Sequence, residues 1–129
     1  MNKVCQFASI QKVESNDDGT LTVVGIASDG SVDADGETIT PDAMRAALPD
    51  FMALGTGALR EMHQLSAAGT VNEAMVDESG ATVITARVVD PVAVLKVRMG
   101  VYKGFSVGGS STSRVGKAIT GLRLTEISL

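Results

Sequence analysis

The sequence predicts a single α+β domain that is mostly β, built as a closed or partly open barrel of about seven strands with two or more helices around it. Short alternating or β-branched segments recur along the chain, and turn clusters rich in Gly, Asp and Asn separate them. Two further segments begin like helices. The length of 129 residues suits one domain, and neither a linker nor a repeat divides residues 1–129.

Strands are expected wherever alternation or β-branched residues dominate. The expected strands are residues 3–14, 20–28, 58–64, 70–77, 81–89, 103–109 and 119–129. Dense turn clusters at 15–19 and 77–80 predict that the flanking strands pair as hairpins. The acidic, glycine-containing residues 29–40 are expected to form a loop.

Two helices are predicted from their N-terminal sequences. The Thr-Pro-Asp run at 40–42 supplies an N-cap, a proline at the first helical position and an acid in the first turn. This helix should cover 43–54, with Pro49 kinking or ending it and the following glycines, Gly55 and Gly57, stopping it. Asp90 and Pro91 repeat the signal and predict a helix to about residue 98.

Composition argues against several functional classes. The net charge of −4 and the pI of about 4.8, without a Lys/Arg stripe, argue against nucleic-acid binding. One cysteine and one histidine make a poor zinc site, so no metal or cofactor is expected, and Cys5 should be buried in a protein of a reducing compartment. No signal peptide and no run of about 18 apolar residues is recognisable, so the chain is expected neither to be exported nor to cross a membrane.

Ser106 and His63 are the residues best suited to chemistry. His63 is the only histidine, and Ser106 is framed by Gly104, Gly108 and Gly109. A serine becomes a nucleophile when an imidazole takes its proton, and glycines leave backbone N–H groups near the oxyanion formed on attack. The same residues also fit an ordinary strand with glycines at a bulge and a structural histidine, so both interpretations stay open.

A third residue should orient the imidazole, and three acids are candidates: Glu126, Glu61 and Glu73. Glu126 is expected on the same strand face as Leu122 and Leu124, and a carboxylate on an apolar face needs a partner. Other patterns are weaker. The glycine- and serine-rich residues 104–116 do not form a phosphate-binding loop, and the acidic residues 29–37 lack the spacing of an EF-hand and are expected to be a solvated loop.

Six motifs occur in an order that suggests a family. They are GIA at 25–27, DADGE at 33–37, ITPDA at 39–43, His63 followed by GTV at 69–71, VYKGFSVGG at 101–109 and LTEISL at 124–129. Together they resemble the tailed-phage prohead (capsid maturation) serine proteases, most closely the XkdF-like branch. The resemblance covers about residues 20–129, and its most specific parts are the blocks around Ser106 and Glu126.

The resemblance implies a fold like that of the herpesvirus assemblin proteases and a serine endopeptidase without a cofactor. Its substrates would be the phage scaffolding protein, the N-terminal extension of the major capsid protein and the protease itself, inside the procapsid assembling in the bacterial host cytoplasm; a homodimer is a further expectation. Ser106 matches the nucleophile, His63 the general base and Glu126 the third member, with backbone support from residues 107–109 (Val107, Gly108 and Gly109). Family members continue beyond the last motif, so Leu129 is expected to be an autocleavage end or an artificial one.

Two other functions remain open from the sequence. The domain could be a catalytically silent structural or decoration module of the capsid with the same fold. It could also be a small-ligand binding protein that holds an anion at the glycine-rich segment around Ser106.

Overall fold

The computed structural model describes residues 3–33, 35–54 and 57–129, and its side chains from Ala8 onward except Leu54. Eight strands and two helices occur in this part of the chain: β1 (Lys3–Ser15), β2 (Leu21–Ser28), β3 (Thr38–Ile39), α1 (Pro41–Leu54), β4 (Ala58–Arg60), β5 (Ala67–Val76), β6 (Thr82–Val88), α2 (Pro91–Arg98), β7 (Gly104–Val115) and β8 (Ala118–Ser128). The domain is therefore mostly β with two helices, as predicted. The expected burial of Cys5 concerns a side chain outside the described set.

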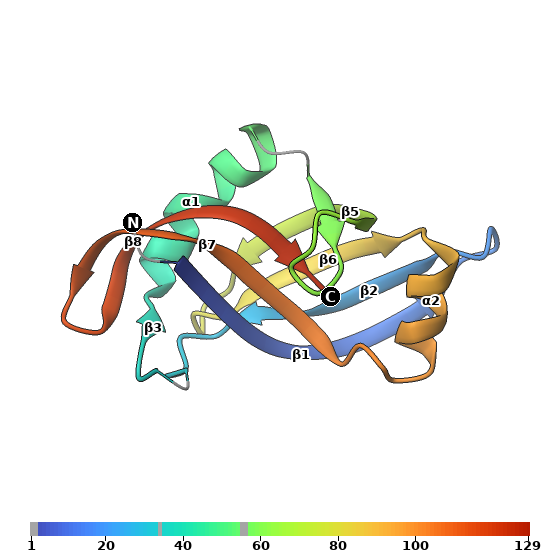
Figure 1. The fold of residues 1–129 in the computed structure, drawn as a ribbon, viewed down its shortest axis with the longest axis horizontal. Helices are drawn as coiled ribbons and strands as arrows, with labels where there is room; N and C mark the ends of the chain where they lie inside the picture. Colours follow the sequence, from blue (N-terminus) through green and yellow to red (C-terminus); the bar gives the residue numbers. More distant parts are fainter. Residues whose placement is uncertain (1–2, 34, 55–56) are drawn as a thin grey trace.

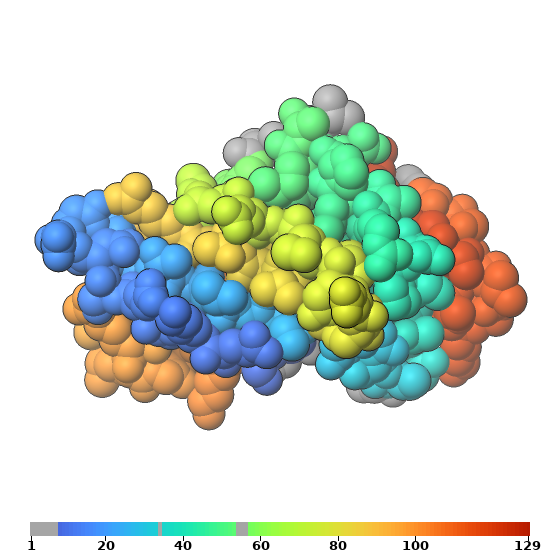
Figure 2. Space-filling view, turned by 180° about the vertical axis from the view of Figure 1, so that it is seen from behind, coloured from blue at the N-terminus to red at the C-terminus, as the bar shows by residue number. Residues whose placement is uncertain are grey.

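The strands form one sheet that closes on itself. Their order is β3-β8-β4-β5-β6-β2-β1-β7, and β7 also pairs with β8, which completes a ring of hydrogen-bonded strands (Figure 1). The pairs are antiparallel except that β3 and β4 run parallel to β8. Helix α1 connects these two short strands and lies over β8, while α2 lies at the opposite end of the molecule (Figure 1). The space-filling view from behind shows α1 beside the surface formed by β5 and β6 (Figure 2).

Neither helix of the described chain has the length and apolar character needed to span a membrane.

Both predicted hairpins are confirmed, since β1 pairs with β2 and β5 pairs with β6 in antiparallel fashion. Both helix starts are confirmed as well: Thr40 Oγ1 accepts the N–H of Ala43 at 3.1 Å, and Asp90 Oδ2 accepts the N–H of Ala93 at 2.9 Å. Helix α1 does not end at Pro49 but continues to Leu54. Of the two glycines expected to stop α1, Gly57 has a φ of 68°, and Gly55 lies outside the described residues.

Two strand predictions are wrong in detail. Residues 38–39, placed in a loop by their acidic surroundings, form the short strand β3, because Thr38 and Ile39 find parallel partners in Ala118 and Ile119. The strand expected over 58–64 ends at Arg60, so His63 lies in the turn between β4 and β5. The first error comes from a partner that is distant in sequence. The second comes from a local turn, in which Glu61 N–H donates to the Ser66 carbonyl at 3.2 Å and Arg60 pairs with Ala67 of β5.

Aliphatic side chains fill the interior of the ring, as the low aromatic content predicts. Phe105 is the largest fully buried side chain, and it lies among residues of β2, β6 and β8. A Cβ on Gly25 of β2 would lie 3.0 Å from the Phe105 ring, which explains the glycine at that strand position. The side chains that are fully buried around it include Leu21, Val23, Ile84, Val88, Val107, Ile119 and Ile127.

The ladder between β7 and β8 contains a register shift at Gly108 and Gly109. Gly109 is opposite Leu124 and Gly108 is opposite Glu126, so one step along β7 corresponds to two along β8 and Thr125 is the extra residue. A bulge of this kind reverses the alternation of side chains along a strand. Glu126 therefore lies on the opposite face from Leu124. The expectation that Glu126 shares the face of Leu122 and Leu124 is wrong, because it assumed a regular strand.

We expect the substitution Gly109→Ala to destabilise the fold by about 1 to 3 kcal/mol, the usual cost of overpacking. The added Cβ would lie 3.1 Å from the carbonyl carbon of Arg123 and closer still to its oxygen, and backbone atoms of β8 cannot rotate away. Urea unfolding measures the change. The control Ser110→Ala, one residue along β7, should change stability by less than about 0.5 kcal/mol. Equal unfolding midpoints for Gly109→Ala and the unmodified protein would contradict the close approach of β8.

Candidate active site

Ser106 and Glu126 lie on the same face of neighbouring strands. Phe105 of β7 is completely buried, so Ser106 and Gly108 belong to the opposite, outward face. Across the β7–β8 ladder Ser106 is opposite Ser128, and Gly108 is opposite Glu126. Glu126 is consequently a diagonal neighbour of Ser106, at a separation that long side chains bridge. This placement depends on the bulge, which turns Glu126 outward.

His63 reaches this face from the turn that follows β4. The turn is fixed to the end of β8 by two backbone hydrogen bonds: Leu129 N–H donates to the Arg60 carbonyl at 2.8 Å, and Met62 N–H donates to the Leu129 carbonyl at 2.9 Å. Met62 and His63 have φ angles of 49° and 59°. Residues other than glycine are rarely left-handed, and such conformations cost about 1 to 3 kcal/mol and cluster at functional sites. The strain is concentrated at the residue predicted to be the general base.

The carboxylate of Glu126 joins three side chains. Its Oε1 lies 2.6 Å from His63 Nδ1, and its Oε2 lies 3.3 Å from Arg60 Nη1 and 3.4 Å from the Ser128 hydroxyl. The Glu126 side chain is only 12% exposed, so these contacts replace the water that burial removes. A carboxylate offers only acceptors, and His63 therefore donates its Nδ1–H to Glu126. The other ring nitrogen, Nε2, is left as the basic one.

Ser106 and His63 line the same pocket, which has a volume of about 350 Å³. Its remaining lining residues are Met62, Val101, Tyr102, Lys103, Gly104 and Leu129. The pocket is thus formed by the turn after β4, the segment that leads into β7, and the end of β8. The structure brings the predicted nucleophile and the predicted base to one cavity, with the predicted acid in contact with the base.

Gly108 is required by the position of the Glu126 side chain. A Cβ at residue 108 would lie 2.6 Å from Glu126 Cγ and 2.9 Å from Glu126 Cδ. The carboxylate therefore crosses directly over the backbone of β7 on its way to His63. The glycines around Ser106 were expected to leave backbone N–H groups near a substrate oxyanion. At Gly108 the approaching group is a side chain of the protein itself.

The backbone groups expected to support an oxyanion lie within paired strands. Val107, Gly108 and Gly109 are paired with β1 on one side and with β8 on the other. Over this stretch the only irregularity of either ladder is the register shift between Gly108 and Gly109. The extra residue at this point is Thr125 of β8 and not a residue of 107–109.

The other two candidate acids do not serve His63. The Glu61 Oε1 accepts a hydrogen bond from the Tyr102 hydroxyl at 2.8 Å and lies 3.7 Å from Lys96 Nζ. Burial and the hydrogen bond to Glu61 raise the pKa of Tyr102, so its phenol keeps the proton that it donates. Glu73 is exposed on β5. Of the three acids, only Glu126 is brought to the histidine.

Sequence reasoning missed Arg60 and Ser128 as partners of Glu126. Ser128 could have been found, because it lies two residues after Glu126 on the same strand face. No local spacing in the sequence connects Arg60 with Glu126. Arg60 reaches Glu126 through the parallel pairing of β4 with β8, which places Arg60 opposite Ser128 across 68 positions of sequence (128 − 60 = 68).

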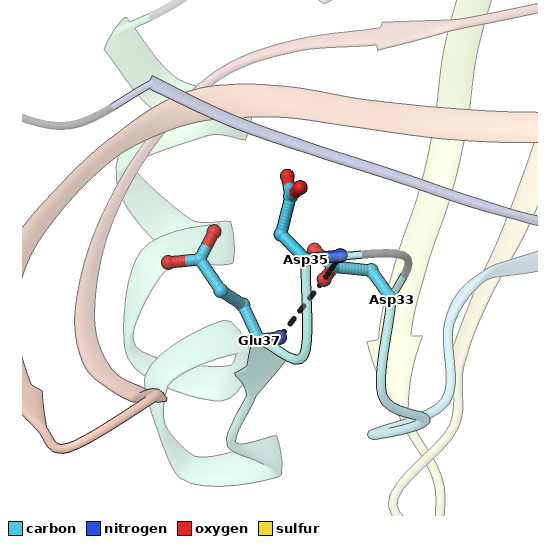
Figure 3. A group of neighbouring side chains, drawn as sticks. All are labelled: Asp33, Asp35 and Glu37. Atoms are coloured by element: carbon cyan, nitrogen blue, oxygen red, sulfur yellow. Dashed lines mark hydrogen bonds between the residues drawn. The ribbon is translucent and has the colours of Figure 1, made fainter.

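An acidic group before β3 holds Asp33, Asp35 and Glu37, whose carboxylates approach within 4.8 Å of one another (Figure 3). Their contacts explain the arrangement. Asp33 Oδ1 accepts the N–H groups of Asp35 and Glu37, each at 2.9 Å, which closes the turn. Glu37 forms an ion pair with Arg114, and Lys117 Nζ donates to the Asp35 carbonyl at 3.0 Å. The carboxylates of Asp33 and Glu37 thus have structural partners, while Asp35 is held through its backbone carbonyl and is exposed.

We expect the substitution Gly108→Ala to displace the Glu126 side chain while leaving the ring of strands folded. The new Cβ would collide with atoms of a side chain, which can rotate, and not with the backbone. The proton NMR signal of the His63 Nδ1–H, shifted far downfield by its short bond to Glu126, should disappear or move upfield. Circular dichroism should stay unchanged. The control Ser113→Ala on the same strand should keep the downfield signal, and its retention in Gly108→Ala would contradict the described path of Glu126.

Comparison with known proteins found no match to a protein-family model, to a curated protein or to a solved structure.

Proposed function

We propose that the protein is a serine endopeptidase, with Ser106 as nucleophile, His63 as general base and Glu126 as the acid that orients the imidazole. The observation that carries this proposal is the 2.6 Å contact between Glu126 and His63 Nδ1 at a pocket that His63 shares with Ser106. The three residue types in these relative positions supply a nucleophile, a base and an orienting group. The left-handed backbone of His63 adds support, because such strain is retained where function requires it.

In the proposed reaction, His63 Nε2 takes the Ser106 hydroxyl proton as Oγ forms a bond to the carbonyl carbon of the substrate. The carbonyl electron pair moves to oxygen and gives a tetrahedral oxyanion. When this collapses, the carbon–nitrogen bond breaks, and His63 gives its proton to the departing amine, leaving an acyl-serine. Water then attacks the ester with His63 again as base, which releases the carboxylic acid and restores Ser106. Glu126 stabilises the imidazolium formed in both halves.

Residues around the triad support the charge changes of this cycle. Arg60 and Ser128 hold the second oxygen of Glu126, so the carboxylate keeps its position while the imidazole gains and loses a proton. For the oxyanion we propose backbone support from Val107, Gly108 and Gly109, the residues to which the resemblance points.

The biological role that we propose follows from the motif order. The chain would be a prohead protease that cleaves the scaffolding protein, the N-terminal extension of the major capsid protein and itself within the procapsid of a tailed phage, in the cytoplasm of the bacterial host. The ring of strands with two helices is compatible with an assemblin-like barrel. The strongest support is that the two most specific motifs, around Ser106 and around Glu126, form adjacent strands of one site.

We expect Ser106→Ala and His63→Ala each to lower peptide hydrolysis by a factor of about 10⁴ to 10⁶, as loss of a nucleophile or base does in serine proteases. Glu126→Gln should cost less, because it alters the orientation and charge stabilisation of the imidazole and spares the nucleophile. Cleavage of the purified scaffolding protein, followed by gel electrophoresis and mass spectrometry, measures the loss. Thr112→Ala, at an exposed position of β7, is the control and should cleave like the unmodified protein.

The same experiment separates the rival functions. A silent capsid module would cleave nothing, and its Ser106 would not react with a fluorophosphonate probe. An anion-binding protein would bind phosphate or acetate at Ser106 but would not hydrolyse peptides. Undiminished cleavage by Ser106→Ala would disprove the assignment of the nucleophile.

Activity should fall as the pH is lowered from 8 to 5, the interval in which an imidazole gains its second proton. A protonated Nε2 cannot accept the Ser106 proton, so the acylation step stops. Pre-steady-state acylation by a chromogenic ester, measured across this interval, reports that step directly. A rate that stays constant over the whole interval would exclude His63 as the base.

A further inference from the structure

The pocket beside Ser106 has mainly apolar walls. Met62, Val101 and Leu129 line it together with Tyr102. Apart from His63, Lys103 is the only residue with a side chain that is charged at neutral pH among the described residues that line the pocket, and Lys103 is exposed. A substrate group that enters this pocket would meet carbon atoms on most sides.

Two of these apolar residues are exposed. Met62 is 63% exposed and Val101 is 62% exposed, and both line the pocket. Their backbones are fixed: Met62 N–H donates to the Leu129 carbonyl at 2.9 Å, and Val101 N–H donates to the Lys96 carbonyl at 2.8 Å. Exposed apolar groups held beside a cavity mark a binding site that exists before the ligand arrives.

The charged groups next to the pocket neutralise one another. Tyr102 donates to Glu61 at 2.8 Å, and Lys96 Nζ lies 3.7 Å from the same carboxylate oxygen and 5.5 Å from the centre of the Tyr102 ring. The carboxylate of Glu61 and the ammonium of Lys96 therefore partner each other, and neither is among the described residues that line the pocket. The hydrogen bond between Tyr102 and Glu61 also connects the segment before β7 to the turn that carries Met62, so both walls are held at a fixed separation.

We propose that this pocket binds an apolar side chain of the substrate, that of the residue whose carbonyl carbon Ser106 attacks. The inference rests on the proposed endopeptidase function and adds the class of peptide that the site accepts. A volume of about 350 Å³ is sufficient for one large aliphatic or aromatic side chain. A charged side chain would give up its hydration without a partner, except that an acidic one could meet Lys103. An acidic substrate residue is thus the principal rival.

Three peptidyl phosphonate diphenyl esters test the proposal. They are identical except for the residue that bears the phosphorus, which is the analogue of Leu, Glu or Lys. In each, Ser106 Oγ would form a bond to phosphorus as a phenoxide leaves, and the Ser106 proton would pass to His63. The second-order rate constant of labelling is measured by intact-mass spectrometry, and peptide mapping locates the label. We expect the Leu analogue to react at least about tenfold faster than either charged analogue.

The outcomes distinguish this inference from the function on which it rests. Labelling of Ser106 with the Glu analogue fastest, or with all three at similar rates, would overturn the apolar pocket and leave the serine hydrolase intact. If neither these reagents nor a small fluorophosphonate labels Ser106, the proposed function fails and the inference fails with it. Labelling in the expected order supports both.

A pair of matched substitutions makes the test independent of reagent reactivity. Val101→Glu places a carboxylate in the wall of the pocket, whereas Val92→Glu places one on the exposed side of α2 at a residue that does not line it; Val92 is 57% exposed. Val101→Glu should lower the preference for the Leu analogue over the Lys analogue by at least about tenfold. Val92→Glu should leave it unchanged. Fluorophosphonate labelling confirms that Ser106 stays reactive in both, and an unaltered preference in Val101→Glu would contradict the proposal.

Discussion

The arrangement of the site depends on one irregularity in the backbone, the register shift between β7 and β8 at Gly108 and Gly109. Before the shift, β8 directs Leu122 and Leu124 toward the interior. After it, Glu126 and Ser128 face outward beside Ser106, while Ile127 enters the core opposite Val107. Without the extra residue, the carboxylate would be directed into an aliphatic interior that has no partner for it. Because of the bulge, the single strand β8 supplies both Leu124 and Ile127 to the core and Glu126 to the site.

The Glu126 side chain contacts residues of three strands, β8, β4 and β7. It comes from β8, its partner Arg60 comes from β4, and its side chain crosses Gly108 of β7 to reach His63. A carboxylate that is 12% exposed requires compensation, and two of its partners, Arg60 of β4 and His63 of the following turn, tie that part of the chain to β8. His63 in turn is held by the backbone contact between Met62 and Leu129. Backbone contacts of the fold in this way fix the position of the His63 imidazole beside Glu126.

Local sequence patterns predicted most of the fold. Turn clusters located both hairpins, and the capping residues Thr40 and Asp90 located both helices, because these signals act between residues close in sequence. Patterns failed at the two short strands. Among the described strands, β3 pairs only with β8, so the strand at Thr38 was not foreseen. The end of β4 before His63 was not foreseen either, because alternation did not reveal that the chain turns after Arg60 and pairs with β5. The structure brings the three predicted residues Ser106, His63 and Glu126 to one place, but the reason given for Glu126 was wrong, since alternation cannot reveal a bulge.

The closure of the ring has a consequence for the order of events during synthesis. Ser106 and Glu126 belong to the last two strands, and β8 must lie between β7 and β4 before Arg60 and His63 can meet the carboxylate. A chain emerging from the ribosome from its N-terminus therefore has no assembled triad until its final strand is in place. If Ser106 cleaves its own chain or its neighbours, that capacity begins only with a completed domain. Under the proposed function, the topology would delay the first turnover until β8 has joined the ring.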